Sequence, residues 1–566
     1  MSTWEPTKPP AYKIRKGCEA ADWKELFDAV CENTRALPSL KDNRALRNIV
    51  DYLNWYKCST VLVGSPFHDR DYLYDYLHHF GSIFEDCGRD CIRLHFFSGD
   101  RINRDSPLRS LRELVSGLER PRPLGFEQSG YLGFMVLRPT GRYCVGRTIL
   151  KYPDQPMASW DIHTRARYDV HLHGVNLRVV GAPFMQQDAS SHVCAGAALW
   201  CLLYDLHRRY GTPRRFPRQI TEIAREQFTG IKFPTGHTPA QIAHVLREVG
   251  CAQDVQYVEM KTSDGTPKDD YKQVFRKFVD TVYGYVQSNL PLILGFKIPG
   301  YPEVGKEQGH AVMVVGHDHS HLTTSETSDP RAWGRFGCSS ERVGSFICQD
   351  DGRGAYQPLR VWKSAPKLPF ISENAWSEAP VLENADWLFM APGLTRDAHM
   401  LYDQARGTLR TGLINIKALV DVLSSGYVLP AGTLPDIEAV EDTLPDCFVR
   451  LYIQQSRRFR RFVLDKVRGR WKLDESHIEV YQQMPLPRYV WVCDVCDPKD
   501  TDSQGRFRAI AEFVLDATAP KFAQPSSLLA FRVGRLLRVT RGAFSRWWEA
   551  PKGTPDPYAP LNAEDY

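Results

Sequence analysis

The chain has 566 residues, of which 43% are hydrophobic and 25% charged, and its 72 basic and 67 acidic residues leave a formal net charge of +5. This composition is typical of globular domains, and at about 150 residues per domain the length predicts two to four of them. So small an excess of positive charge does not indicate binding to nucleic acid or to a membrane surface, and we expect neither.

The sequence also points to a compartment. No stretch approaches the roughly 18 uninterrupted apolar residues of a membrane span, and the first residues lack the basic and apolar segments of a signal peptide. The 14 cysteines do not have the dense, regular spacing of a secreted disulfide scaffold. We therefore expect a cytoplasmic protein, in which a cysteine is by default a small buried apolar residue.

Residues 1–165 have the pattern of an N-terminal α/β accessory domain. Helical patterns cover 22–56, 69–84 and 108–118. Runs of β-branched or alternating apolar residues predict strands at 59–64, 91–97, 131–139 and 146–150.

Residues 166–365 predict an α+β domain, because helices are followed by consecutive strands that suit an antiparallel sheet. Helices are expected at 194–210, 238–250 and 271–290, and strands at 177–180, 291–296, 310–316 and 345–349. Gly211-Thr212-Pro213 ends the first helix, and Thr238 with Pro239 begins the second as N-cap and first-turn residue.

Residues 366–550 have the mixed pattern of a C-terminal α/β accessory domain. Two strands are expected at 489–493 and 510–516, joined by a polar turn at 497–505. The Pro- and acid-rich tail, 551–566, is expected to be disordered. Both accessory regions are too long to be linkers, so we expect them to select substrates or to bind a regulatory protein partner.

The most informative residue is Cys194, which stands between a polar, turn-prone stretch and a run of small and apolar residues. That arrangement places a thiol at the N-terminus of a buried helix. The partial positive charge and free N–H groups of a helix N-terminus stabilise an anionic thiolate. Cys194 is therefore a candidate nucleophile, provided that the chain supplies a base and a group that orients the base.

The best candidate base is His310, which opens an apolar strand directly after the polar segment 305–309. Asp350 follows the next short strand, where its carboxylate can accept the second ring N–H of the histidine. Gln187 or its neighbour Gln186 can donate to an oxyanion beside the backbone N–H of Cys194. These residue types in this order predict acyl transfer through a thiol.

The order glutamine, cysteine, histidine, aspartate and the residues around them resemble the papain-like cysteine peptidases, with the C39-like group as the closest branch. The resemblance covers the middle third of the chain; the matching pieces are Gln187, 194–199, 309–316 and 346–352. It implies a papain-like core in which the helix bearing the cysteine packs on an antiparallel sheet. It also implies hydrolysis of a peptide or isopeptide bond in a protein or peptide substrate, through a thioester on Cys194.

Two assignments stay open in the sequence, because both the glutamine and the acid are doubled. Gln186 can replace Gln187 as the oxyanion donor, and Asp351 can replace Asp350, although Asp350 ends the strand more directly. Ala195 stands where many relatives have glycine. The alternative functions are a papain-like module that binds a protein without catalysis, and a transglutaminase- or amidase-type acyl transfer.

Other motifs have plainer explanations. Cys493 and Cys496 form a CxxC without a partner pair at zinc spacing, so we expect neither a metal nor a cofactor. The arginine clusters at 457–470 and 532–541 are read as solvated faces rather than nucleic-acid contacts. Cys201 lies on the same helix as Cys194 and is read as a core residue. Four further histidines compete with His310 but do not open an apolar strand after a glycine: His192, His237, His317 and His319.

Overall fold

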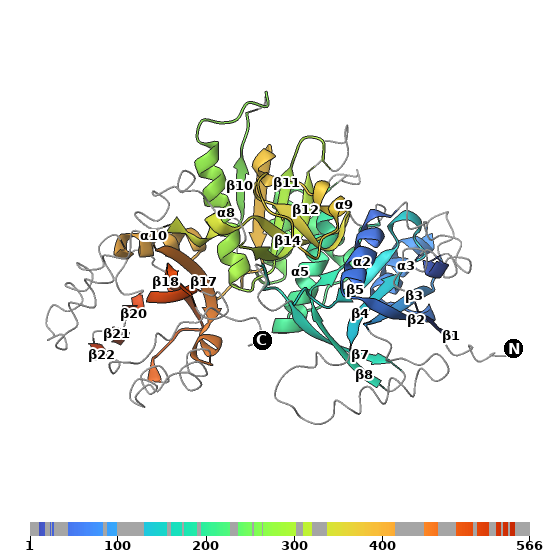
Figure 1. The fold of residues 1–566 in the computed structure, drawn as a ribbon, viewed down its shortest axis with the longest axis horizontal. Coiled ribbons are helices and arrows are strands. Elements are labelled where there is room, and N and C mark those ends of the chain that lie inside the picture. The colour runs from blue at the N-terminus through green and yellow to red at the C-terminus, as the bar shows by residue number, and fades with distance from the viewer. Residues whose placement is uncertain are drawn as a thin grey trace.

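The computed structural model describes residues 11–16, 23, 25–27, 43–82, 88–98, 130–154, 160–172, 175–188, 194–226, 236–251, 254–262, 264–301, 309–319, 337–413, 447–461, 483–501, 507–519, 528–533, 536–541 and 544–549. The structure contains three large sheets, each associated with helices (Figure 1). The expected α+β class with antiparallel sheets is confirmed. Within the described residues no helix is both long enough and apolar enough to cross a membrane.

The first sheet has six antiparallel strands in the order β1-β2-β3-β4-β5-β9. Its strands are β1 (Ala11–Lys16), β2 (Cys58–Phe67), β3 (Cys91–Ser98), β4 (Tyr131–Leu137), β5 (Val145–Leu150) and β9 (Pro183–Phe184). The helices of this region are α2 (Arg44–Trp55) and α3 (Arg70–His78). The four strands expected here are therefore present, while the helix expected at 108–118 lies outside the described residues.

The central sheet positions the candidate site. Its order is β10-β16-β11-β12-β14-β15, and β6 also pairs with β12. The strands are β6 (Trp160–Ile162), β10 (Gln256–Glu259), β11 (Leu292–Lys297), β12 (His310–Asp318), β14 (Ser345–Asp350), β15 (Gly354–Arg360) and β16 (Trp387–Pro392). The strands predicted at 291–296, 310–316 and 345–349 are all present and antiparallel.

Strand β12 is buried along its whole length because both faces of the sheet are covered. Ala311, Met313 and Val315 belong to the core that holds helix α5 (Cys194–Tyr210), whereas Val312 and Val314 belong to the core that holds helix α8 (Tyr271–Gln287). Successive side chains of a strand point to opposite faces. Alternate residues of β12 therefore fix the cysteine-bearing helix on one face and α8 on the other.

Smaller elements connect these layers. Strands β7 (Ala166–Leu172) and β8 (Val175–Gly181) form a separate hairpin. Helix α6 (Pro217–Arg225) precedes α7 (Pro239–Glu248), which Thr238 caps as predicted: its Oγ1 accepts from the Gln241 backbone N–H, and the Gln241 side chain accepts from the Thr238 N–H at 2.9 Å. The short helix α9 spans Glu373–Ser377, and α10 spans Tyr402–Leu413.

The third sheet follows the order β13-β17-β18-β19-β20-β21-β22. Its strands are β13 (Gly337–Cys338), β17 (Phe448–Gln455), β18 (Tyr489–Thr501), β19 (Phe507–Asp516), β20 (Leu528–Val533), β21 (Leu536–Arg541) and β22 (Phe544–Glu549). The predicted pair of strands is β18 with β19, which are antiparallel. Trp491 and Val449 of this sheet share a core with α8. The tail at 551–566 lies outside the described residues.

Sheet membership crosses the expected domain boundaries near residues 165 and 365. Strand β6, before the first boundary, pairs with β12, and β9, after it, pairs with β5. Strand β16, after the second boundary, pairs with β11 inside the central sheet. One continuous core runs from Trp23 to Ala391. The three-domain division itself stays a prediction.

Candidate active site

Helix α5 begins at Cys194, the residue at which the sequence predicted its start. Ala195, Gly196, Ala197 and Ala198 follow and are all buried. Small side chains let a helix backbone approach a sheet closely, and α5 packs against β12. The helix thereby holds its N-terminal thiol at one end of the central sheet.

Cys194 is distinguished from the other thiols by its exposure. Burial is described for ten free cysteines, and nine of them are buried while Cys194 is half-buried. Burial raises the pKa of the Cys251 thiol to about 12. It also raises the pKa of Cys201, which lies two turns along the same helix. Those thiols are held neutral and away from solvent, as expected of core cysteines.

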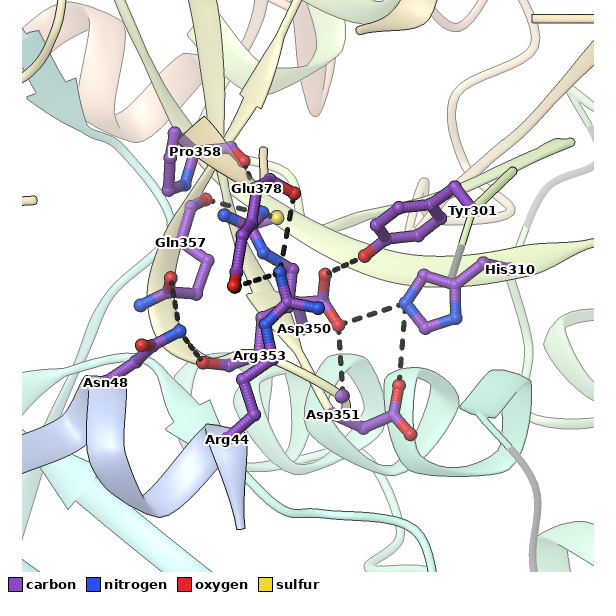
Figure 2. A network of polar contacts seen from close by, with 12 residues as sticks. Arg44, Asn48, Tyr301, His310, Asp350, Asp351, Arg353, Gln357, Pro358 and Glu378 are labelled. Carbon is purple, nitrogen blue, oxygen red and sulfur yellow. Dashed lines mark hydrogen bonds and ion pairs between the residues drawn. The ribbon is translucent and has the colours of Figure 1, made fainter. Parts of the chain in front are cut away.

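His310 is the first residue of β12, and Asp350 is the last residue of β14. The two strands are antiparallel, with Met313 opposite Gln349. The first residue of β12 and the last residue of β14 therefore lie at the same end of the sheet. There His310 Nε2 lies 3.0 Å from Asp350 Oδ1, and both side chains are buried (Figure 2).

The electrostatics of this pair favour an imidazolium beside a carboxylate. Burial lowers the pKa of His310, but the charge and hydrogen bond of Asp350 and the hydrogen bond with Cys194 raise it well above its ordinary value. Burial raises the pKa of Asp350, but His310, Arg353 and Arg44 lower it well below its usual range. An ionised Asp350 can only accept, so Nε2 carries a proton and Nδ1 is the ring nitrogen left for Cys194.

The Asp350 carboxylate is held in place from two sides. Its Oδ1 accepts from the Gly352 backbone N–H at 3.0 Å, within the tight turn that joins β14 to β15. Its Oδ2 accepts from the Tyr301 hydroxyl at 3.2 Å. The Tyr301 ring also packs edge-on against the His310 ring, with centroids 5.7 Å apart. Tyr301 was not predicted, and a lone tyrosine after a strand gives no signal by which it could be.

The turn carrying Asp350 is braced by the N-terminal region. The Asn48 side chain, on α2, donates to the Arg353 carbonyl at 2.8 Å. The buried Arg353 guanidinium donates to the Pro358 carbonyl at 2.7 Å (Figure 2). It also donates to the Ala375 carbonyl at 2.6 Å. Helix α2 of the N-terminal region thus contacts the turn that holds the acid.

Asp351 lies next in the same turn, with Oδ1 3.8 Å from His310 Nε2. Of the two acids left open by the sequence, Asp350 is the nearer to the histidine. Within the described part of the chain, His310, Asp350 and Asp351 are the one group of three potential metal ligands whose donor atoms lie within 4.8 Å of one another. Cys493 and Cys496 are buried in β18 and belong to no such group among the described residues.

The two glutamines have different environments. Gln186 is buried and bound in a network, because its Oε1 accepts from Asn43 Nδ2 at 3.0 Å and its carbonyl accepts from Arg138 at 2.8 Å. The Gln187 side chain is half-buried, and no hydrogen bond to it is found among the described residues. An amide already engaged with Asn43 is a poor donor to a substrate, so the environments favour Gln187. Residues 189–193, including His192, lie outside the described residues.

The competing histidines lie elsewhere or pair differently. His317 stands at the other end of β12, where its Nε2 is 3.0 Å from both His163 Nε2 and Gln287 Oε1. Burial and the neighbouring histidines lower the pKa of His317 well below its ordinary value, and the pKa of His163 falls to about 4, chiefly through burial. His319 packs edge-on against His317, and His237 precedes α7. Cys194 is among the groups that raise the pKa of His310.

Comparison with family models, curated proteins and solved structures finds no match to this chain.

Proposed function

We propose that the protein is a cysteine peptidase, a thiol hydrolase that cleaves a peptide or isopeptide bond through a thioester on Cys194. One observation carries the proposal: the half-buried Cys194 thiol at a helix N-terminus interacts with His310 and raises the pKa of its imidazole, and His310 is in turn hydrogen-bonded to Asp350. A nucleophile, a base and an orienting group in series is the arrangement that covalent acyl transfer requires.

The chemistry follows from the positions of the protons. The Cys194 sulfur attacks the carbonyl carbon, and His310 Nδ1 carries the proton that the thiol has lost. When the tetrahedral intermediate collapses, that proton passes to the leaving amine and a thioester remains on Cys194. Water then attacks the thioester with His310 as its base, which releases the acid and restores the thiol. Asp350 keeps the imidazole in the required orientation and stabilises its charge.

We assign two hydrogen-bond donors to the oxyanion of the tetrahedral intermediate: the Gln187 side chain and the backbone N–H of Cys194 at the start of α5. The assignment rests on the Gln186 amide being bound to Asn43. Gln187→Ala should lower the rate of hydrolysis by about 10²-fold or more, as expected for loss of one oxyanion donor. Gln186→Ala should instead lower the stability, by about 1–3 kcal/mol, because it leaves a buried polar partner unsatisfied.

The papain-like core belongs to the same proposal. Helix α5 carries the cysteine on one face of an antiparallel sheet, and the strand beneath it carries the histidine. This arrangement supports a papain-like core, and free thiols throughout the described residues support a reducing, cytoplasmic setting.

The test is a pair of variants read with a thiol-directed probe and a peptide mixture. Cys194→Ala should abolish hydrolysis with the fold retained by circular dichroism. Iodoacetamide should label Cys194 in the wild type and much more slowly in His310→Ala. Cys201→Ala, a buried thiol on the same helix, is the matched control and should change neither result. Full hydrolysis by Cys194→Ala would contradict the proposal. An equal rate of Cys194 labelling in wild type and His310→Ala would favour a non-catalytic binding module. Transfer of the acyl group to an added amine would show that the reaction is transglutamination instead of hydrolysis.

A further inference from the structure

An aromatic surface, formed by Trp387 and Tyr257, lies at the edge of the central sheet, two and three strands from β12. Strand β11 lies between β12 and β16, and β10 lies beyond β16. Among the described strands β10 pairs only with β16, so β10 is an edge strand. Phe296 pairs with His310, and the next residue, Lys297, pairs with Trp387. The start of β16 therefore lies at the same end of the sheet as the base.

Trp387 is in direct contact with the residue before the base. A Cβ atom added to Gly309 would lie 2.6 Å from the Trp387 ring, so the indole covers the Gly309 backbone. A side chain at position 309 would displace that ring. Trp387 is only partly buried, and it packs against the core that includes α5.

Tyr257 extends this surface outward. Its ring centroid lies 5.7 Å from that of Trp387, and the tyrosine is 49% exposed. Three large hydrophobic residues are exposed among those whose burial is described: Leu77, Val255 and Tyr257. Two of the three therefore lie at β10 or directly before it.

The aromatic surface and helix α5, which bears the thiol, lie on the same face of the sheet. Tyr257 pairs with Phe389, and Trp387 is two residues from Phe389 on β16, so the three side chains share a face. Phe389 belongs to the core that contains Ala195 and Ala198 of α5. Adjacent strands are about 4.8 Å apart, which puts β16 about 10 Å and β10 about 14 Å from β12. An extended peptide covers that span in about three or four residues.

We infer that Trp387 and Tyr257 form a substrate subsite, which binds an aromatic or branched apolar side chain of the peptide within about four residues of the bond that Cys194 attacks. This inference rests on the proposed function, because the occupant is argued from the contact of Trp387 with Gly309, the residue before His310, on the face of the sheet that α5 covers. Apolar contact on two aromatic rings favours such a side chain over a small one by about 1.4 kcal/mol, a tenfold preference.

The test is a cleavage profile of a proteome-derived peptide mixture, with Cys194→Ala as the blank. The wild type should prefer Phe, Tyr, Leu or Ile about tenfold at one fixed position near the cleaved bond. Tyr257→Ala should reduce that preference towards unity, and Trp387→Leu should reduce it while keeping an apolar residue in the core. Leu77→Ala removes an equally exposed apolar residue from α3 and should change nothing.

The outcomes separate this inference from the proposed function. The labelling rate of Cys194 by iodoacetamide, which carries no side chain to bind, should be the same in wild type and Tyr257→Ala. Cleavage without an apolar preference at any position, or a preference that survives both Tyr257→Ala and Trp387→Leu, would overturn the subsite. No cleavage beyond the Cys194→Ala blank would instead overturn the peptidase.

Discussion

The two ends of strand β12 carry histidines in opposite states. At one end His310 is bonded to an ionised aspartate, and its pKa is raised. At the other end His317 faces His163 and Gln287, and its pKa is lowered. Both imidazoles are buried in the same strand. The difference shows that burial alone does not decide the charge of a histidine; the partner does.

The largest expected effect comes from removing the partner of His310. In Asp350→Asn the imidazole loses its carboxylate and its fixed orientation, so Cys194 labelling by iodoacetamide at pH 7 should slow by about 10²-fold or more. Asp351→Asn should slow it far less, because Asp351 lies 3.8 Å from Nε2 against 3.0 Å for Asp350. Equal losses in the two variants would mean that the acids share the role.

His163, which contacts His317 at the other end of β12, should make the free energy of unfolding fall in acid. A folded-state pKa of about 4 against about 6.5 in the unfolded chain means that only the unfolded state takes up this proton between those values. The free energy of unfolding should therefore fall as pH decreases from 6.5 to 4, by about 3 kcal/mol for this group. Urea unfolding across that range measures it, and His163→Gln should flatten the slope. If the free energy of unfolding falls with the same slope against pH in His163→Gln and in wild type, the loss of stability comes from other groups.

His310 should give the free energy of unfolding a pH dependence of the opposite sign. Its raised pKa means that the stabilisation is fully present below about pH 6.5 and is lost as pH rises through the folded value. The lowered pKa of Asp350 preserves the ion pair down to strongly acidic pH. The difference in unfolding free energy between wild type and His310→Gln should therefore be greatest between about pH 4 and 6.5 and shrink in alkali. A difference that grows in alkali would indicate a neutral His310.

The smallest expected effect comes from removing the Tyr301 hydroxyl, which should shift the pKa of His310 slightly. Tyr301→Phe keeps the ring against His310 but removes the hydrogen bond to Asp350 Oδ2. A carboxylate relieved of one donor attracts the imidazolium proton more strongly, so the pKa of His310 should rise further. Such a hydrogen bond is worth about 1 kcal/mol, and NMR titration of the imidazole measures the shift. A lower pKa in the variant would contradict this role for Tyr301.

Local features of the fold could be predicted from the sequence, and long-range ones could not. The start of α5 at Cys194 follows from the change from polar to small apolar residues, and the start of β12 at His310 follows from the glycine and apolar run around it. Sheet order depends on pairings between distant segments, so the place of β16 in the central sheet was not foreseen. Tyr301 and the brace from Asn48 to Arg353 were missed because only the folded chain brings them to Asp350.

The thiol and its base come from segments separated by helices α6, α7 and α8, and the acid is held by a turn that α2 braces. A nascent or partly unfolded chain therefore carries Cys194 without its histidine, as an unactivated cysteine. Pairing of such distant segments is slow compared with the formation of local helices. The rate at which Cys194 reacts during refolding should thus report the completion of tertiary structure, and the growing chain would carry no active nucleophile during synthesis.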